Sequence, residues 1–216
     1  MAVASLSIGV VAHCARAEIA HQLAHSVNAD VLSLDDGTLG CEANHYETWK
    51  LLADTDTDWA IVLEDDAAPI NDFRDQAAQA LTVAPTPIVS FYLGTGYPPQ
   101  HQPAIQKAID NANHADACWI TSRNLLHGVA YAIRTDLLPN LIAHRSPLPV
   151  DQHITWWARP RKHPIGYTHP SLVDHRDLTP VITVRTDTMP RDTPRHAWTT
   201  GAHHRWTTVT VPMPPS

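Results

Sequence analysis

The chain has 216 residues, of which 44% are hydrophobic and 17% charged, and its formal net charge is −7. This length suits one α/β domain and is too short for two domains of ordinary size, and the composition excludes disordered and fibrous proteins. The apolar start lacks the features of a signal peptide, and no stretch reaches the roughly 18 apolar residues that span a bilayer. We therefore expect a cytoplasmic protein without a membrane span.

Charge is divided unevenly along the chain. Residues 1–120 have four basic and 16 acidic side chains, which gives −12, whereas residues 121–216 have 11 basic and six acidic ones, which gives +5. The second part is the better candidate for contact with an anionic partner, unless the two parts only balance each other's charge. The three cysteines have no CxxC spacing, so neither a disulfide framework nor a zinc knuckle is indicated.

The first elements predict a β-α-β unit. Residues 6–12 form a short β-rich apolar run, residues 16–27 have helical spacing, and residues 30–34 resemble a second strand that is closed by an Asp-Asp-Gly turn. The elements expected next are a helix at 41–53, a strand at 59–63, a helix at 72–81, a strand at 88–93 and a loop at 94–102. This alternation favours an α/β fold with a doubly wound, mostly parallel sheet flanked by helices and ligands at the carboxyl ends of its strands.

The second half of the chain contains fewer clear elements. A strand is predicted at 129–133, a helix at 135–144 and a short helix at 151–157, and periodicity fades from residue 159 onward. We therefore assign residues 1–178 to a single domain and residues 179–216 to an extended C-terminal tail or lid with little core of its own.

Three consecutive acids, Glu64, Asp65 and Asp66, follow the apolar strand at 59–63. Carboxylates gathered at a strand end are costly unless a cation neutralises them, and Mg²⁺ or Mn²⁺ takes carboxylate oxygens together with water and phosphates. The alternative is a solvated turn or the cap of the following helix.

The surroundings of this turn resemble glycosyltransferase family 25, which includes lipopolysaccharide-type and collagen galactosyltransferases. The resemblance rests on LGCEANHYETWKLL and WAIVLEDDAAPINDF, and later on HGVAYAIRTDLL, PLPVDQHITWWA and HPSLVDH, which follow in the family's order. Two departures are Asn44, where the family usually has Ser, and AHCAR at residues 12–16, where it has Asn-Leu-Asp-Arg. The resemblance implies a GT-A-like, Rossmann-related fold and a metal-dependent, inverting sugar transfer from a nucleotide-sugar, UDP-sugar above all.

The resemblance also implies roles for individual residues. Asp66 would be the principal metal ligand for Mn²⁺ or Mg²⁺, and His175 a second ligand, as GT-A enzymes often supply a histidine from a late strand. Glu64 and Asp65 would act through water or contact the ribose. Further residues that this resemblance places at the nucleotide-sugar are Ala12, His13, Asn44 and His45.

Other candidates come from the residue types themselves. Asp35 and Asp36 follow a parallel strand and are placed to accept hydrogen bonds from a uracil or ribose, although a plain Asp-Gly turn explains them as well. Arg16 begins a helix and suits a phosphate. Asp151, at a proline-bounded helix start, is the predicted catalytic base, with a helix cap as the alternative.

Three functions stay open from the sequence. The first is sugar transfer to a hydroxyl of a saccharide or protein acceptor. The second is transfer to a modified DNA base, motivated by the positive second part and by Trp156, Trp157, Trp198 and Trp206, which could stack on bases. The third is a nonenzymatic nucleotide-sugar-binding module.

Overall fold

The structure is a computed structural model, and it describes residues 2–179, 181 and 194–215. The strands are β1 Leu6–His13, β2 Val31–Asp35, β3 Trp59–Glu64, β4 Ala67–Pro69, β5 Ile88–Ser90, β6 Trp119–Ser122, β7 Ala130–Arg134, β8 Ile165–Thr168, β9 Val173–His175 and β10 Thr210–Pro212. The helices are α1 Ala17–Ser26, α2 Cys41–Ala53, α3 Phe73–Thr82, α4 Gln102–Ala115, α5 Leu138–Ala143 and α6 Val150–Ala158, with short 3₁₀ turns η1 Cys14–Arg16, η2 Pro99–His101 and η3 Thr135–Leu137.

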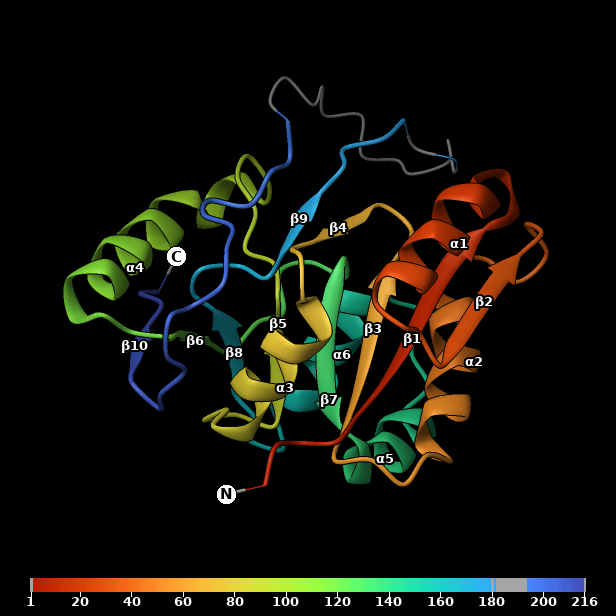
Figure 1. Cartoon of the computed structure of the whole chain (residues 1–216), viewed down its shortest axis with the longest axis horizontal. Helices are drawn as coiled ribbons and strands as arrows, with labels where there is room; N and C mark the ends of the chain where they lie inside the picture. The colour runs from red at the N-terminus through yellow and green to blue at the C-terminus, as the bar shows by residue number, and fades with distance from the viewer. Residues whose placement is uncertain (1, 180, 182–193, 216) are drawn as a thin grey trace.

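An eight-stranded sheet forms the centre of the described chain, in the order β10-β6-β8-β5-β7-β3-β1-β2 (Figure 1). Among the described strands, four of its seven pairings are parallel, and the antiparallel ones join β7 to β3, β7 to β5, and β6 to β8. The expected α/β fold with a mostly parallel sheet is therefore confirmed. Because β1, β2 and β3 run in one direction, their carboxyl ends meet at one edge of the sheet.

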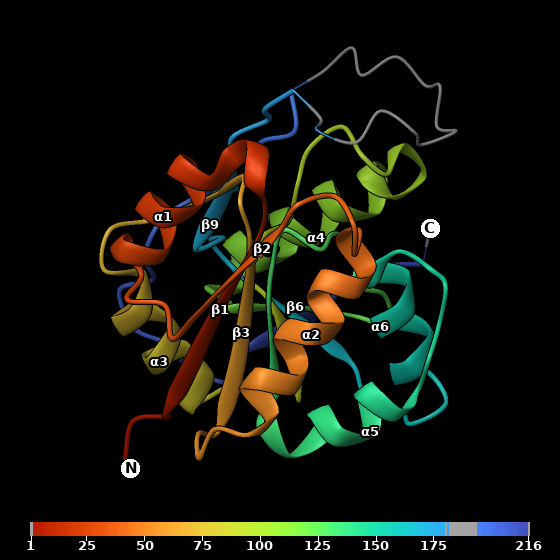
Figure 2. The ribbon, with the colours of Figure 1, turned by 90° about the vertical axis from the view of Figure 1, so that its right-hand side faces the viewer.

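Helices cover both faces of this sheet. Alternate residues of β3 enter two different cores: Trp59, Ile61 and Leu63 pack with α1 and α3, whereas Ala60 and Val62 pack with α2, α4, α5 and α6. This follows from the two-residue period of a strand, which turns successive side chains to opposite faces. Figure 2 shows α2, α5 and α6 together on the face opposite α1 and α3. The result is a sandwich of helix, sheet and helix with continuous apolar strands in the middle.

A second, two-stranded sheet extends from the carboxyl end of β3. Its strands β4 and β9 are antiparallel, with Ala67 opposite His175 and Pro69 opposite Val173. The backbone N–H of Arg176 also donates to the carbonyl of Asp66 at 2.9 Å. This pairing brings a strand from late in the sequence beside the acidic turn.

Residues 194–215 pack on the main body of the protein. Strand β10 pairs in parallel with β6 at the sheet edge, and Trp206 is buried against Trp119 with a centroid distance of 5.7 Å. This part of the expected tail is therefore an edge of the sheet with its own share of the core. The remainder of the expected tail or lid, at 180 and 182–193, lies outside the described residues.

Most elements predicted from the sequence are confirmed, among them the helix at Cys41–Ala53 with both of its bounds. The strand expected at 88–93 ends at Ser90. Elements that the sequence interpretation missed are α4, β4, β6, β8 and β10. No helix among the described residues is long and apolar enough to cross a membrane.

Candidate active site

The candidate site lies where β1, β2 and β3 end, and the three acids of the turn point to three different places there. Glu64 is the last residue of β3 and faces α2, whereas Asp65 faces the turn after β1 and Asp66 faces β9. Since Asp65 and Asp66 form the turn between β3 and β4, the backbone changes direction there and three adjacent carboxylates can reach different partners. Each acid therefore has its own surroundings.

Glu64 ends a chain of hydrogen bonds that starts in the core. Trp49 Nε1 donates to the Tyr131 hydroxyl at 2.8 Å, which leaves the hydroxyl proton for His45 Nδ1 at 2.9 Å. His45 therefore carries its own proton on Nε2, which faces Glu64 Oε1 at 3.3 Å. His45 is fully buried. These hydrogen bonds fix the tautomer of His45. They also fix the direction of the Glu64 carboxylate, which is partly exposed.

The position of the Glu64 carboxylate also requires glycine at position 128, because glycine has no Cβ atom. A Cβ atom at this position would lie 2.8 Å from Glu64 Oε1 and 2.6 Å from Val150 Cγ1. Both distances are shorter than real Cβ contacts, so only glycine lets the start of α6 approach the end of β3 this closely. Cys41, His45 and Glu64 also have possible ligand atoms within 4.8 Å of one another. This group could hold a metal ion only if His45 lost the Nε2 proton that faces Glu64.

Asp65 is paired with Arg16 in the turn after β1. Arg16 Nη1 lies 2.6 Å from Asp65 Oδ1, and the backbone N–H of His13 donates to Asp65 Oδ2 at 3.1 Å. Burial raises the pKa of Asp65, and the hydrogen bonds from Arg16 and His13 offset only part of this effect. Arg16 thus lies at the acidic turn and binds a carboxylate of the protein, while its contact with a phosphate stays a prediction.

Asp66 is paired with His175 of β9. His175 Nε2 lies 3.4 Å from Asp66 Oδ2, and Arg16 Nη1 lies 3.4 Å from the same oxygen. Burial raises the pKa of Asp66, but the hydrogen bond and charge of His175, with the charges of Arg16 and Arg195, outweigh burial and bring it below its usual value. Asp66 is therefore ionised at neutral pH, and the two residues predicted as metal ligands are neighbours.

The tautomer of His175 sets a condition on its role as a ligand. The backbone N–H of Asp177 donates to His175 Nδ1 at 2.8 Å, so the neutral ring holds its proton on Nε2, which faces Asp66. In this arrangement His175 donates to Asp66 and has no lone pair to offer. Coordination of a metal by Nε2 would require the loss of the Asp177 contact.

Two buried polar atoms near this pair lack hydrogen-bond partners within the described part of the chain. They are Asp66 Oδ1 and His127 Nε2. The His127 ring lies 4.9 Å from that of Tyr92, and Tyr92 lies 6.0 Å from His175, so both atoms belong to one neighbourhood. Burial and the charges of His175 and Arg195 lower the pKa of His127 to about 3, which keeps this ring neutral. A buried orphan carboxylate oxygen is the feature that a bound cation would satisfy.

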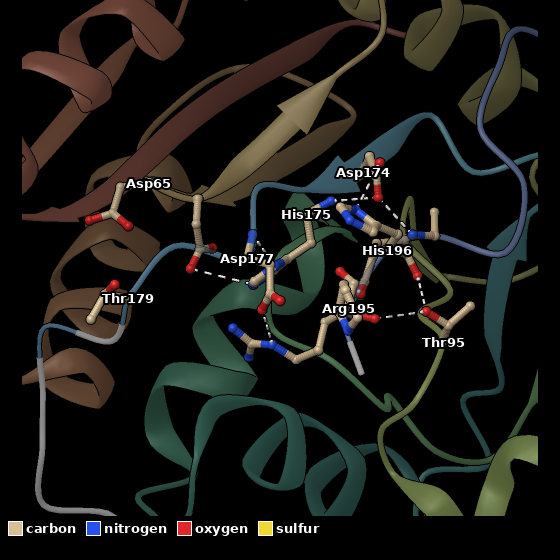
Figure 3. Close-up of polar contacts among 12 residues, drawn as sticks. Asp65, Thr95, Asp174, His175, Asp177, Thr179, Arg195 and His196 are labelled. Atoms are coloured by element: carbon tan, nitrogen blue, oxygen red, sulfur yellow. Dashed lines mark hydrogen bonds and ion pairs between the residues drawn. The ribbon is translucent and has the colours of Figure 1, made fainter. Parts of the chain in front are cut away.

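The segment 194–197 closes one side of this neighbourhood. Arg195 Nε donates to Asp177 Oδ1 at 2.9 Å, and the Tyr92 hydroxyl donates to the carbonyl of Arg195 at 3.0 Å. Figure 3 shows Asp177 beside His175 with its carboxylate joined to Arg195. From the sequence, Arg195 is only one of several basic residues in the second part of the chain, and His127 only the first residue of HGVAYAIRTDLL. Each gains its place at the site only when distant segments pack together.

Asp35 and Asn44 are engaged by the protein itself. The carboxylate of Asp35 accepts backbone N–H groups from Gly37, Leu39 and Gly40 at 2.9–3.0 Å. Burial raises its pKa, but these three bonds dominate and lower it. Asn44 Nδ2 donates to the carbonyls of Ala12 and Ser33, each at 3.2 Å. These contacts favour the turn for Asp35 and a brace between β1 and β2 for Asn44.

The remaining candidates lie around the same edge. Asp36 is exposed and accepts the backbone N–H of Thr38 at 3.1 Å, and His13 caps η1 through its ring. Asp151 lies in the first turn of α6, without a side-chain cap on that helix. Its charge helps to raise the pKa of the buried Tyr167, after the larger effect of burial. The site thus brings Arg16, Glu64, Asp65, Asp66 and His175 together. Asp151 follows Val150 in α6, and it is Val150 that packs against Gly128.

Comparisons with known proteins give one family. The model described as glycosyltransferase family 25 (LPS biosynthesis protein) matches residues 12–138. No curated protein matches the sequence.

Among solved structures, A197 from STIV is similar with a TM-score of 0.47 and 11% identity over 78% of this chain and 85% of that one. A protein proposed to be a glucose-1-phosphate thymidylyltransferase, from Bacillus anthracis and in complex with a sucrose, has a TM-score of 0.44 and 7% identity over 78% and 92%. A glycosyltransferase involved in glycosylation of the major capsid of PBCV-1 has a TM-score of 0.35 and 10% identity over 72% and 77%. Scores at this level carry no argument.

Proposed function

Because the chain belongs to glycosyltransferase family 25, we propose that it transfers a sugar from a UDP-sugar to a hydroxyl acceptor, with Mn²⁺ or Mg²⁺ and with inversion at the sugar carbon. That it is a glycosyltransferase follows from the family. The donor, the metal and the stereochemistry are the proposal. The observation that supports it most is Asp66, an ionised carboxylate at the end of β3 with a buried oxygen that has no partner among the described residues.

The donor set of the site fits a hard divalent cation. Asp66 Oδ1 could serve as a ligand without giving up a hydrogen bond to the described residues, whereas His175 could do so only in the other tautomer. A bound cation would supply electrostatic stabilisation for the departing diphosphate. Arg16 and Arg195, whose charges both act on Asp66, would add to this stabilisation from the protein's side.

Asp151 is the proposed base. In an inverting displacement the acceptor hydroxyl forms a bond to the sugar carbon while the bond to the diphosphate oxygen breaks, and the hydroxyl proton passes to a carboxylate. The place of Asp151 in the first turn of α6 favours its ionised form. Glu64 is held in place by its hydrogen bond with His45. It would orient the donor or the acceptor.

A donor screen tests this function. The protein is incubated with Mn²⁺ and a panel of UDP- and GDP-sugars, and released nucleotide and transferred sugar are measured. We expect release with at least one UDP-sugar, and loss of release on removal of the metal with EDTA. The matched variants are Asp66→Asn, which keeps the size of the side chain and removes its charge, and Asp136→Asn at an exposed site away from the turn.

The proposal predicts a loss of UDP binding for only one of these two variants. Asp66→Asn should weaken binding of UDP with Mn²⁺ by at least about tenfold, since a charged ligand is lost, whereas Asp136→Asn should bind as the wild type does. No release across the whole panel, together with unchanged UDP binding by Asp66→Asn, would overturn the metal-dependent reaction.

The other two functions have less support. The family favours an enzyme over a nonenzymatic binding module. The idea of a modified DNA base as acceptor depended on tryptophans that could stack on bases, and Trp157 and Trp206 are buried in the core. Trp156 is exposed, but Trp198 donates to Gln102 at 3.2 Å. A saccharide or protein hydroxyl is the acceptor that we retain.

A further inference from the structure

A second concave site lies away from the acidic turn, between the end of β6, the end of α6 and the residues after β10. It is a cavity of about 460 Å³, lined by Arg123, Arg159, Ser122, Asn124, His101 and Met213 with the two prolines that follow. This volume lies in the range of pockets that hold small ligands. None of these described lining residues is acidic. Two arginines therefore face one cavity, and no side-chain carboxylate belongs to the described part of its wall.

Arg159 is held in place for an anion. Its Nη2 donates to Asn124 Oδ1, and its guanidinium carbon lies 5.0 Å from the centre of the Trp156 ring. One of its five N–H donors is used in this way within the described chain, so the others stay available to a ligand. A guanidinium that is already fixed loses little conformational freedom on binding, which favours bidentate contact with a phosphate or carboxylate.

Arg123 adds a second charge from an exposed position. Within the residues that the structure describes, neither Arg123 nor Arg159 has a carboxylate within the 4.0 Å of an ion pair. The loop that carries Arg123 is anchored by Asn124, whose carbonyl accepts the Tyr167 hydroxyl at 2.7 Å. Two of the positive charges that give residues 121–216 their net +5 therefore lie together at this cavity, next to an anchored loop.

We propose that this cavity binds the anionic group, phosphate or carboxylate, of a small ligand, with Arg123 and Arg159 as its charged contacts. The group has one of two sources. It belongs to an acceptor substrate whose hydroxyl reaches the acidic turn, or to a separate small anion. The loop 122–128 favours a link between the two sites, because it begins at the cavity and ends with His127 and Gly128 at Tyr92 and Glu64.

The test measures binding of inorganic phosphate and of glucuronate to the full chain by calorimetry at low ionic strength, without any sugar donor. The variants are Arg123→Gln and Arg159→Gln, and Lys107→Gln is the matched control, since it removes one exposed charge from α4 outside the cavity. We expect at least one of the two anions to bind, each arginine variant to weaken it by about tenfold or more, and the control to stay within twofold.

Arg123→Gln is the decisive variant because its side chain is exposed, so its melting temperature should equal that of the wild type. The proposal fails if neither anion binds, if Arg123→Gln binds as the wild type does, or if Lys107→Gln weakens binding equally. Because no donor is present, this result is separate from success or failure of the proposed sugar transfer.

A transfer assay then distinguishes the two sources. If the anion belongs to the acceptor, Arg123→Gln should raise KM for acceptors that carry a phosphate or carboxylate and leave KM for neutral acceptors unchanged. If the anion is a separate ligand, KM should be unchanged for both kinds of acceptor while calorimetry still shows the loss. Either pattern agrees with an anion site in this cavity.

Discussion

Replacement of Tyr131 by phenylalanine tests whether a series of hydrogen bonds stabilises the candidate site. These bonds link Trp49, Tyr131, His45 and Glu64. The Tyr131 hydroxyl accepts from Trp49 at 2.8 Å and contacts His45 at 2.9 Å, and all three side chains are buried. Without this oxygen, two buried polar groups lose a partner, and each such loss costs about 1–3 kcal/mol. We expect the free energy of unfolding to fall by about 2–6 kcal/mol, out of the roughly 5–15 kcal/mol of a typical domain.

Urea unfolding followed by tryptophan fluorescence and circular dichroism measures this loss. The control is Tyr97→Phe, the same change at a side chain that is 48% exposed, for which we expect a difference within about 0.5 kcal/mol. The m value, which is the slope of unfolding free energy against urea concentration, should be the same in both variants. If Tyr131→Phe lowers the free energy of unfolding by less than about 1 kcal/mol, the buried hydrogen bonds of Tyr131 do not stabilise the fold.

Three further predictions concern the site. Gly128→Ala should lower the free energy of unfolding by about 1–3 kcal/mol, because the new Cβ meets Val150 and Glu64, and it should also slow transfer; full stability in thermal unfolding would contradict this contact. Arg195→Gln should weaken UDP binding by about tenfold, since its charge acts on the site of Asp66, and a change below twofold in calorimetry would exclude this role. Asp66 has a folded pKa below the unfolded value of 3.8, so its stabilising contribution is complete above that pH and is lost as the pH falls through the folded pKa. Wild type should therefore lose more unfolding free energy than Asp66→Asn below about pH 4, and parallel pH profiles would refute the shift.

Local patterns predicted most of the fold. The helix Cys41–Ala53 and the apolar strand before the acidic turn depend on periodicity that is complete within each segment. Helix α4 was missed although Ala104, Ile105 and Ala108 repeat with helical spacing after a proline in the first turn. The signal was present there, but no element was assigned between the loop at 94–102 and the strand at 129–133.

The direction of β7 and the place of the C-terminal segment could not be predicted in the same way. Strand β7 is antiparallel between β3 and β5, and its own sequence is equally suited to either direction. Trp206 completes a core that its neighbours in sequence do not reveal, since it packs on Trp119 in the middle of the chain. Pairing between distant segments decides both features.

The same limit applies to the acidic turn, and it changes the argument for a metal. From the sequence, three adjacent carboxylates require a cation because their charges repel. In the fold they separate: Glu64 accepts from His45, and Asp65 has a guanidinium at 2.6 Å, so two of the three are satisfied by the protein. The need for a cation therefore rests on one atom, Oδ1 of Asp66, which is buried and has no partner in the described chain. Replacement of Glu64 or Asp65 should thus leave the response of UDP binding to Mn²⁺ in place, whereas replacement of Asp66 should remove it.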